Sequence, residues 1–204
     1  MSSVDWENRY QQADTPWDKG LPHPMIESWR GLALAPGVIV VPGCGRGWDL
    51  RAWAMMFPQH RVLGIDLAAS AVEYAQKNCA DLSNVRVILA DFFDHASWRS
   101  AAELEGQNVS LVWEHTCFCA IPPSLRETYA ATVASLLEPG AMLVGVFFTD
   151  IRDDDGQGPP WNCALPELRR LFGEHFHIES PPDDHRTFPG REGEERSLSL
   201  RRLD

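Results

Sequence analysis

The segment Val38–Asp49 limits the fold of this chain more than any other part of the sequence. Its first four residues are β-branched, which is typical of a short buried strand. Glycines follow at positions 43, 45 and 47, where they permit backbone angles and close approaches that a Cβ would prevent. A helix beginning at Gly47–Asp49 would present free N–H groups and the positive end of its dipole. Strand, glycine turn and helix together predict a nucleotide-type pocket at the carboxyl edge of a sheet.

The spacing of these glycines excludes two common nucleotide sites. A dinucleotide fingerprint has its third glycine where this chain has Trp48, which argues against a dehydrogenase. No Lys-Ser or Lys-Thr pair follows the turn, so it is not a phosphate-binding P-loop. The G-x-G-x-G pattern after a strand resembles motif I of the class I S-adenosylmethionine-dependent methyltransferases. On this motif alone, a plain strand-turn-helix corner remains the alternative.

Apolar runs and helical patterns alternate along the rest of the chain. Because such alternation is typical of parallel sheets, we expect an α/β fold. It would be a Rossmann-like, seven-stranded, mostly parallel sheet with helices on both faces and a C-terminal antiparallel hairpin. We expect one methyltransferase domain over residues 1–204, with an N-terminal aromatic lid segment at 1–36 and a Rossmann-like core at 37–204. The predicted strands are Val38–Val41, Arg61–Asp66, Val85–Ala90, Val109–Trp113, Ala141–Phe148, Phe176–Glu179 and Arg196–Leu200.

Two carboxylates follow predicted strands at the same edge of this sheet. Asp66 lies roughly 20 residues beyond the glycine turn, where an acid accepts both ribose hydroxyls of a nucleotide. It would otherwise cap the next helix, but Ser70 and Glu73 already offer that helix a capping box. Asp91, followed by Phe92, is suited to adenine, since the acid would bind the amine and the ring would stack. A simple turn aspartate is the alternative for Asp91.

Composition restricts the partners. With 18 basic and 29 acidic side chains the net charge is −11, which argues against nucleic acid and favours small molecules. The five cysteines are odd in number and scattered, so we expect neither a disulfide framework nor a metal site. The first residues lack the pattern of a signal peptide, and no apolar run is long enough to cross a bilayer. We therefore expect a cytoplasmic protein without a membrane partner, and favour a monomer.

Taken together, the motifs resemble the thiopurine S-methyltransferase family, most closely its halide/thiol methyltransferase branch. The resemblance covers nearly the whole chain and is strongest at Thr15-Pro16-Trp17-Asp18 and Pro42-Gly43-Cys44-Gly45-Arg46-Gly47. Further matching stretches are Trp6-Glu7, Gly64-Ile65-Asp66-Leu67, Ala90-Asp91-Phe92-Phe93, Phe118-Cys119-Ala120-Ile121 and Leu137-Glu138-Pro139-Gly140. The resemblance implies an enzyme that uses S-adenosyl-L-methionine and releases S-adenosyl-L-homocysteine. The acceptor would be a small soft nucleophile: a thiol, hydrosulfide, halide, thiopurine or metalloid.

The resemblance also assigns cofactor contacts position by position. Gly43 would lie against the methionine part, Asp66 against the ribose, and Asp91 with Phe92 against the adenine. The other implied contacts are the lid residues Trp6, Tyr10 and Trp17, together with Cys44, Gly45, Leu67, Glu114 and His115. Two positions depart from the branch: Tyr10 replaces a Trp, and His115 replaces the Tyr of an acidic-Tyr pair in which Glu114 keeps the acidic place.

Methyl transfer from a sulfonium is an in-line displacement that needs mainly positioning and exclusion of water. His115 is the candidate base or positioner of the nucleophile, and a structural histidine is the alternative. Aromatic walls from Trp6, Trp17, Trp48 and Phe118 would suit both a sulfonium and an apolar thiol. Cys117 and Cys119 would contact a metalloid or fill the core, Arg152 would clamp an anion, and the acidic 149–162 loop would frame the entrance. The rival functions are an O- or N-methyltransferase and a non-catalytic cofactor-binding module.

Overall fold

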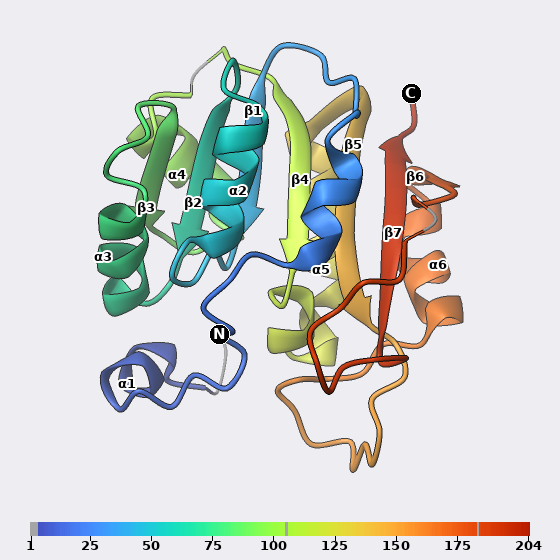
Figure 1. Ribbon diagram of the computed structural model, residues 1–204. Coiled ribbons are helices and arrows are strands. Elements are labelled where there is room, and N and C mark those ends of the chain that lie inside the picture. Colours follow the sequence, from blue (N-terminus) through green and yellow to red (C-terminus); the bar gives the residue numbers. More distant parts are fainter. Residues whose placement is uncertain (1–3, 105, 183) are drawn as a thin grey trace.

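The β-branched runs of the sequence form the centre of one seven-stranded sheet in the computed structural model, which describes residues 4–104, 106–182 and 184–204. The strand order is β3-β2-β1-β4-β5-β7-β6 (Figure 1). Only β7 runs antiparallel to its neighbours β5 and β6, so the predicted sheet and its C-terminal hairpin are confirmed. The strands are β1 (Val38–Pro42), β2 (Arg61–Asp66), β3 (Val85–Leu89), β4 (Val109–His115), β5 (Leu137–Phe148), β6 (Phe176–Glu179) and β7 (Glu195–Arg202).

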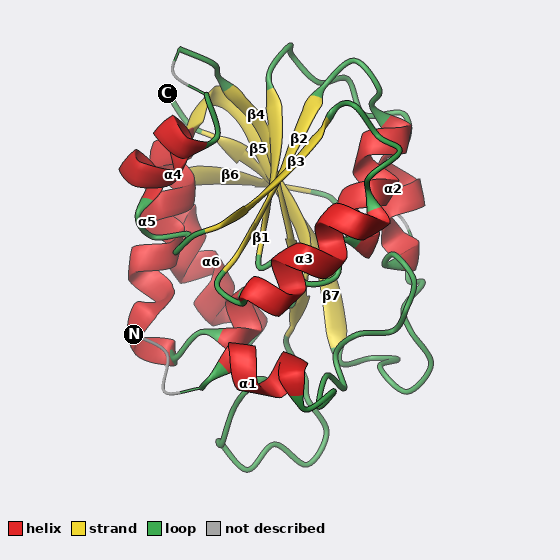
Figure 2. Cartoon of the chain, turned by 90° about the vertical axis from the view of Figure 1, so that its left-hand side faces the viewer, coloured by secondary structure: helices red, strands yellow, loops and turns green. Residues whose placement is uncertain are grey.

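Helices cover both faces of this sheet (Figure 2). On one face, α4 (His95–Ala101), α5 (Arg126–Leu136) and α6 (Leu165–Gly173) enclose a core with Trp98 and Tyr129. On the other, α2 (Trp48–Met56), α3 (Ala69–Asn78) and the 3₁₀ helix η1 (Pro24–Trp29) bury Trp53, Trp113 and Trp29. Strands of a parallel sheet are covered on both sides in this way, which explains why β1 is apolar at every position. Among the described helices, none has the length and apolar character needed to span a bilayer.

The carboxyl ends of the parallel strands meet at one edge of the sheet. The segments gathered there are α1 (Trp6–Gln11), the loop between β5 and α6 and the loop between β6 and β7, at the lower edge of Figure 1. The short 3₁₀ helices η2 (Phe118–Ala120) and η3 (Pro123–Leu125) follow the end of β4. Any site built from strand-end residues therefore lies between the N-terminal segment and these loops.

The predicted capping box at the start of α3 is wrong. Helix α3 begins after Ala68 without a side-chain cap, and Ser70 instead donates its N–H and hydroxyl to the Glu7 carboxylate of α1, at 2.9 and 2.6 Å. Helix α5 also begins without a side-chain cap. Strands β4 and β5 are also longer than predicted, and β4 reaches His115 rather than ending at Trp113.

Candidate active site

The glycine turn after β1 holds the carboxylate of Asp66 through a backbone hydrogen bond. Gly43, Gly45 and Gly47 all have positive φ, of 56°, 54° and 79°. The Gly45 N–H donates to Asp66 Oδ2 at 2.8 Å, and the Ala68 N–H donates to Asp66 Oδ1 at 3.0 Å. The end of β2 is thus tied to the turn after β1, and each carboxylate oxygen keeps a free acceptor position.

Asp66 is 9% exposed, and burial raises its pKa, although the backbone N–H donors oppose that rise. A buried acceptor with two partly used oxygens is suited to a pair of hydroxyl donors, because each new hydrogen bond offsets desolvation of the carboxylate. The geometry therefore fits a ribose at this position.

Gly43 is a close-approach glycine, and an alanine there would place its Cβ 3.1 Å from Cys117 Cβ and 3.2 Å from Cys117 Sγ. We expect Gly43→Ala to lower the melting temperature by about 3–8 °C, since left-handed backbone alone costs about 1–2 kcal/mol. The matched control is Gly140→Ala, because Gly140 has φ of 84° and open space around its Cβ position. Equal melting temperatures of the two variants, measured by calorimetry, would contradict the contact with Cys117.

A cavity of about 610 Å³ opens beside this turn at the strand ends. Its lining is mainly apolar, with a few polar groups among the predicted contacts. Eight predicted contacts line it: Trp6, Tyr10, Trp17, Gly43, Asp66, Leu67, Asp91 and Phe92. Residues the sequence did not single out also line it, including Leu125, Thr128 and Arg191. The cavity has the size and mixed character of a small-molecule site.

Three aromatic residues of the N-terminal segment form one wall of the cavity. The Trp17 ring meets the rings of Trp6 and Tyr10 edge-on, with centroids 5.4 and 5.8 Å apart. The Trp17 Nε1–H donates to the Tyr10 hydroxyl at 3.3 Å. The predicted lid residues are therefore brought together, whereas Trp29 of the same segment is part of the core below.

At the end of β3, the two residues predicted to contact adenine differ in exposure. Asp91 is exposed, and its Oδ1 accepts the Phe93 N–H at 2.9 Å. Phe92 is 6% exposed, and its ring stacks on Trp98 at 6.3 Å. Both line the cavity, as does Phe93. The arrangement leaves one Asp91 oxygen for a ligand amine and an edge of Phe92 for contact.

A smaller cavity, of about 60 Å³, lies against the glycine turn. Cys44, Gly45 and His115 line it together with Trp48, and it shares Tyr10, Trp17, Gly43 and Thr116 with the larger cavity. His115 thus lies beside the turn. Its Nδ1 is 2.7 Å from Asp49 Oδ2, and the side chain is 11% exposed.

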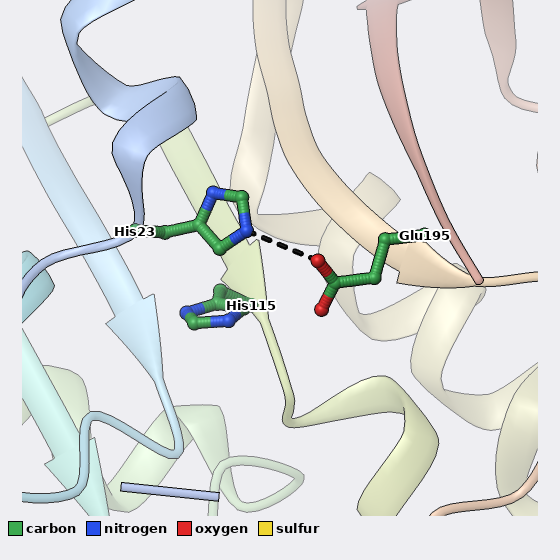
Figure 3. Close-up of side chains that lie close together, drawn as sticks. All are labelled: His23, His115 and Glu195. Atoms are coloured by element: carbon green, nitrogen blue, oxygen red, sulfur yellow. Dashed lines mark hydrogen bonds and ion pairs between the residues drawn. The ribbon is translucent and has the colours of Figure 1, made fainter. Parts of the chain in front are cut away.

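His115 also approaches His23 and Glu195, from the N-terminal segment and β7 (Figure 3). One ring nitrogen of each histidine and a Glu195 oxygen lie within 4.8 Å of one another, a spacing that raises the question of a metal. His23 Nδ1 accepts the Met25 N–H at 3.2 Å, so the ring proton is on Nε2, 3.2 Å from Glu195 Oε2. His23 Nε2 then donates to Glu195 and has no lone pair for a metal. The cluster is better described as a hydrogen-bonded network.

Glu114 lines neither cavity, which corrects its assignment as a cofactor contact. Its carboxylate is 1% exposed and accepts the N–H groups of Cys117 and Phe118, at 3.0 and 2.8 Å. It also accepts the Tyr129 hydroxyl of α5. Burial raises the pKa of Glu114 to about 7, against these hydrogen bonds. Its role in the structure is to hold the turn after β4.

Two further predictions are corrected by the structure. Phe118 is 2% exposed and packs on Tyr129, Phe147 and Phe172, so it belongs to the core rather than to a cavity wall. Arg152 is paired with Glu194 at 2.8 Å and does not line the cavity, whereas Arg191 does. Nothing in the sequence around Arg191 marks it, because it follows an ordinary turn.

The 149–162 loop and two cysteines, Cys117 and Cys119, also contribute to the lining of the larger cavity. Of the acidic 149–162 loop, Pro159 and Pro160 line the larger cavity rather than the aspartates. Cys117 and Cys119 line it too, and burial raises the pKa of both thiols. Both cysteines therefore stay protonated at neutral pH and are free.

Comparison with known proteins gives a consistent result. The family model described as thiopurine S-methyltransferase matches residues 1–200. A probable thiol methyltransferase 2 of Arabidopsis thaliana is 32% identical over 172 residues, which cover 84% of this chain and 72% of that protein. Thiocyanate methyltransferase 1 of Brassica oleracea is 31% identical over 161 residues, covering 78% and 67%.

The fold has a solved counterpart as well. The 1,6-didemethyltoxoflavin-N1-methyltransferase of Burkholderia thailandensis, solved with S-adenosylhomocysteine, superimposes with a TM-score of 0.70. The superposition covers 98% of this chain and 86% of the other at 20% sequence identity. At that identity the likeness concerns the fold alone.

Proposed function

This chain belongs to the thiopurine S-methyltransferase family and is an S-adenosylmethionine-dependent methyltransferase, and we propose how its cavity binds the cofactor and which acceptor it serves. The acceptor we propose is a small soft nucleophile such as a thiol, hydrosulfide, halide, thiopurine or metalloid. One observation carries the proposal: the glycine turn, Asp66, Asp91 and the aromatic N-terminal segment line a single cavity.

The residues present fit the cofactor. Gly43 lines the cavity without a side chain, so a methionine chain would pass close to the backbone there. Asp66 would accept the ribose hydroxyls, and Asp91 and Phe92 would bind the adenine. Trp6, Tyr10 and Trp17 would cover the cofactor, so that residues 1–36 act as a lid on a single domain. Cys44, Gly45 and Leu67 would complete the contacts.

The bound cofactor supplies an activated methyl group that already has its leaving group and positive charge. The chain's own task is to hold the acceptor in line behind that methyl group and to keep water away. The rings of Trp6 and Trp17 favour a cation beside them through their quadrupoles. His115 is our candidate for receiving the proton of an acceptor, because one of its ring nitrogens has no partner within the described residues.

The apolar lining of the larger cavity supports a soft, apolar acceptor. Leu125, Pro159, Pro160 and Phe148 contribute apolar surface, and apolar surface favours polarisable groups over strongly hydrated ones. The cavity's cations are mostly paired already, Arg9 with Asp14 and Arg191 with Glu195. A strongly hydrated anion would therefore find little compensation there.

The test is a methyl-transfer assay with labelled S-adenosylmethionine and a panel of acceptors: methanethiol, hydrosulfide, iodide, a thiopurine and selenite. We expect label in a thiomethyl or methyl-halide product. Transfer only to oxygen or nitrogen acceptors would favour the first rival function. Tight binding of the cofactor without turnover on any acceptor would favour a non-catalytic module.

We also propose that the protein is a cytoplasmic monomer acting on a small molecule, without nucleic acid or a membrane. The five free cysteines are consistent with a reducing compartment. The net charge of −11 disfavours a phosphate backbone as partner. Analytical ultracentrifugation tests whether the protein is a monomer. An electrophoretic mobility-shift assay with duplex DNA tests the absence of nucleic-acid binding.

A further inference from the structure

The ring nitrogen Nε2 of His115 is buried and has no hydrogen-bond partner among the described residues. Asp49, in the first turn of α2, determines which ring nitrogen of His115 carries the proton. Asp49 Oδ1 accepts the His23 N–H at 2.7 Å, and Oδ2 accepts the Trp113 Nε1–H at 2.8 Å. Oδ2 also lies 2.7 Å from His115 Nδ1.

This arrangement fixes the tautomer of His115. Asp49 is an acceptor toward every neighbour, and although burial raises the pKa of its carboxyl, His115 and the other donors outweigh burial and lower it overall. The His115 Nδ1 must therefore donate its proton to Asp49. In the neutral ring this leaves the Nε2 lone pair free.

Two carboxylates lie beside the His115 ring, where they would offset the positive charge of an imidazolium formed during the reaction. Figure 3 shows His115 beside His23 and the Glu195 carboxylate. Glu195 is 3% exposed, and the hydrogen bonds from His23 and Thr187 lower its pKa to about 2 against the effect of burial. Arg191 is paired with Glu195 at 2.9 Å, and Glu114 is adjacent in β4. Carboxylates on α2 and β7 thus face the ring, Glu114 points to the opposite face of β4, and His23 and Arg191 are the opposing groups.

We infer that Asp49 is a positioning residue that holds His115 as proton acceptor, and that the enzyme is built for acceptors that arrive protonated, thiols and hydrogen sulfide, rather than for ready-made anions such as iodide or thiocyanate. The inference rests on the proposed function and narrows its acceptor class. A field that stabilises an imidazolium repels an incoming anion, but it assists a neutral sulfhydryl that hands over its proton.

The step balances in atoms and electrons. The acceptor S–H proton moves to His115 Nε2, which gives an imidazolium paired with Asp49. The sulfur lone pair forms the new S–CH₃ bond. The bond from the methyl carbon to the sulfonium sulfur breaks, and its electron pair stays on that sulfur as a thioether. The imidazolium then returns its proton to solvent after product leaves.

The size of the effect follows from thiol ionisation. A thiol of pKa about 8.5 is about 3% ionised at pH 7, so a base gains at most about 30-fold. Iodide and thiocyanate have no proton to lose, so a base does not accelerate their methylation. We expect Asp49→Asn to lower kcat/KM for methanethiol about 10- to 30-fold at pH 7, because the amide has a single oxygen and cannot accept from the His23 N–H as well as from Trp113 and His115. The loss should shrink as the pH rises, because a growing fraction of the thiol then ionises without help from a base.

A second variant and a control variant complete the test. His115→Gln is the second variant, and it should reproduce the same selective loss if Asp49→Asn folds poorly. Asp81→Asn is the matched control, since Asp81 pairs with Arg51 at the surface. Ring-nitrogen NMR of the wild type should show an unprotonated Nε2, and calorimetry with S-adenosylhomocysteine should show each variant still binding.

The outcomes separate the two claims. A selective loss on methanethiol, with iodide and thiocyanate within about threefold of wild type, supports the inference. Equal losses on all three acceptors, or no loss on methanethiol, overturn it and leave the methyltransferase assignment intact. Absence of methyl transfer by the wild type to every soft acceptor overturns the proposed acceptor class, and the inference with it.

Discussion

Replacing Asp66 by asparagine should raise the dissociation constant for S-adenosylmethionine at least about 100-fold. In our proposal the buried carboxylate accepts two ribose hydroxyls while Gly45 and Ala68 already donate to it. A hydrogen bond to a charged group contributes about 1.5–3 kcal/mol, so losing or weakening two of them costs about 3 kcal/mol or more. An amide presents one acceptor and one donor, and on either side its donor nitrogen would face a backbone N–H, that of Gly45 or that of Ala68.

Titration calorimetry with S-adenosylmethionine and S-adenosylhomocysteine measures this effect. The matched control is Asp91→Asn, because Asp91 is exposed and would make a single contact with the adenine amine. We expect a loss of about 10-fold for that variant. If Asp66→Asn binds within threefold of wild type, Asp66 only ties the glycine turn to β2, and the proposed ribose site is wrong.

The sheet and the glycine turn were predictable because their signals are local. Four β-branched residues, three glycines and a strand-end acid follow one another closely, and the structure places them as expected. Caps were not predictable in the same way. Ser70 matched a capping pattern, but its partner is Glu7, 63 residues away along the chain. A local pattern contains no information on a partner supplied by the N-terminal segment.

The error at Glu114 has a geometric cause. The sequence placed both Glu114 and His115 beyond the strand, where both would face the cofactor. Strand β4 continues to His115, and successive side chains of a strand point to opposite faces. Glu114 therefore faces α5 and Tyr129, whereas His115 faces α2 and Asp49. The pairing of His115 with Asp49 depends on how β4 and α2 lie relative to each other in the fold, which sequence periodicity does not predict.

Glu114 should make the protein less stable as the pH rises from about 4.5 to 7. Burial raises the pKa of this carboxyl to about 7 in the folded protein, from an ordinary value of 4.5. Between these values the folded protein binds more protons than the unfolded chain, so the free energy of unfolding falls with rising pH. A difference of about 2.5 pKa units corresponds to about 3 kcal/mol. The full stabilisation from the neutral acid is present below pH 4.5 and is lost above pH 7.

Glu114→Gln isolates this contribution. The amide oxygen can still accept the Cys117 and Phe118 N–H groups, and the amide N–H can donate to the Tyr129 oxygen, so the turn should survive. Urea unfolding from pH 5 to pH 8 should show the variant gaining about 3 kcal/mol relative to wild type across that range. The exposed Glu138→Gln is the matched control and should run parallel to wild type. Parallel curves for Glu114→Gln as well would mean that the buried carboxylate is ionised throughout, because only a proton bound in the folded state and absent from the unfolded chain produces the divergence.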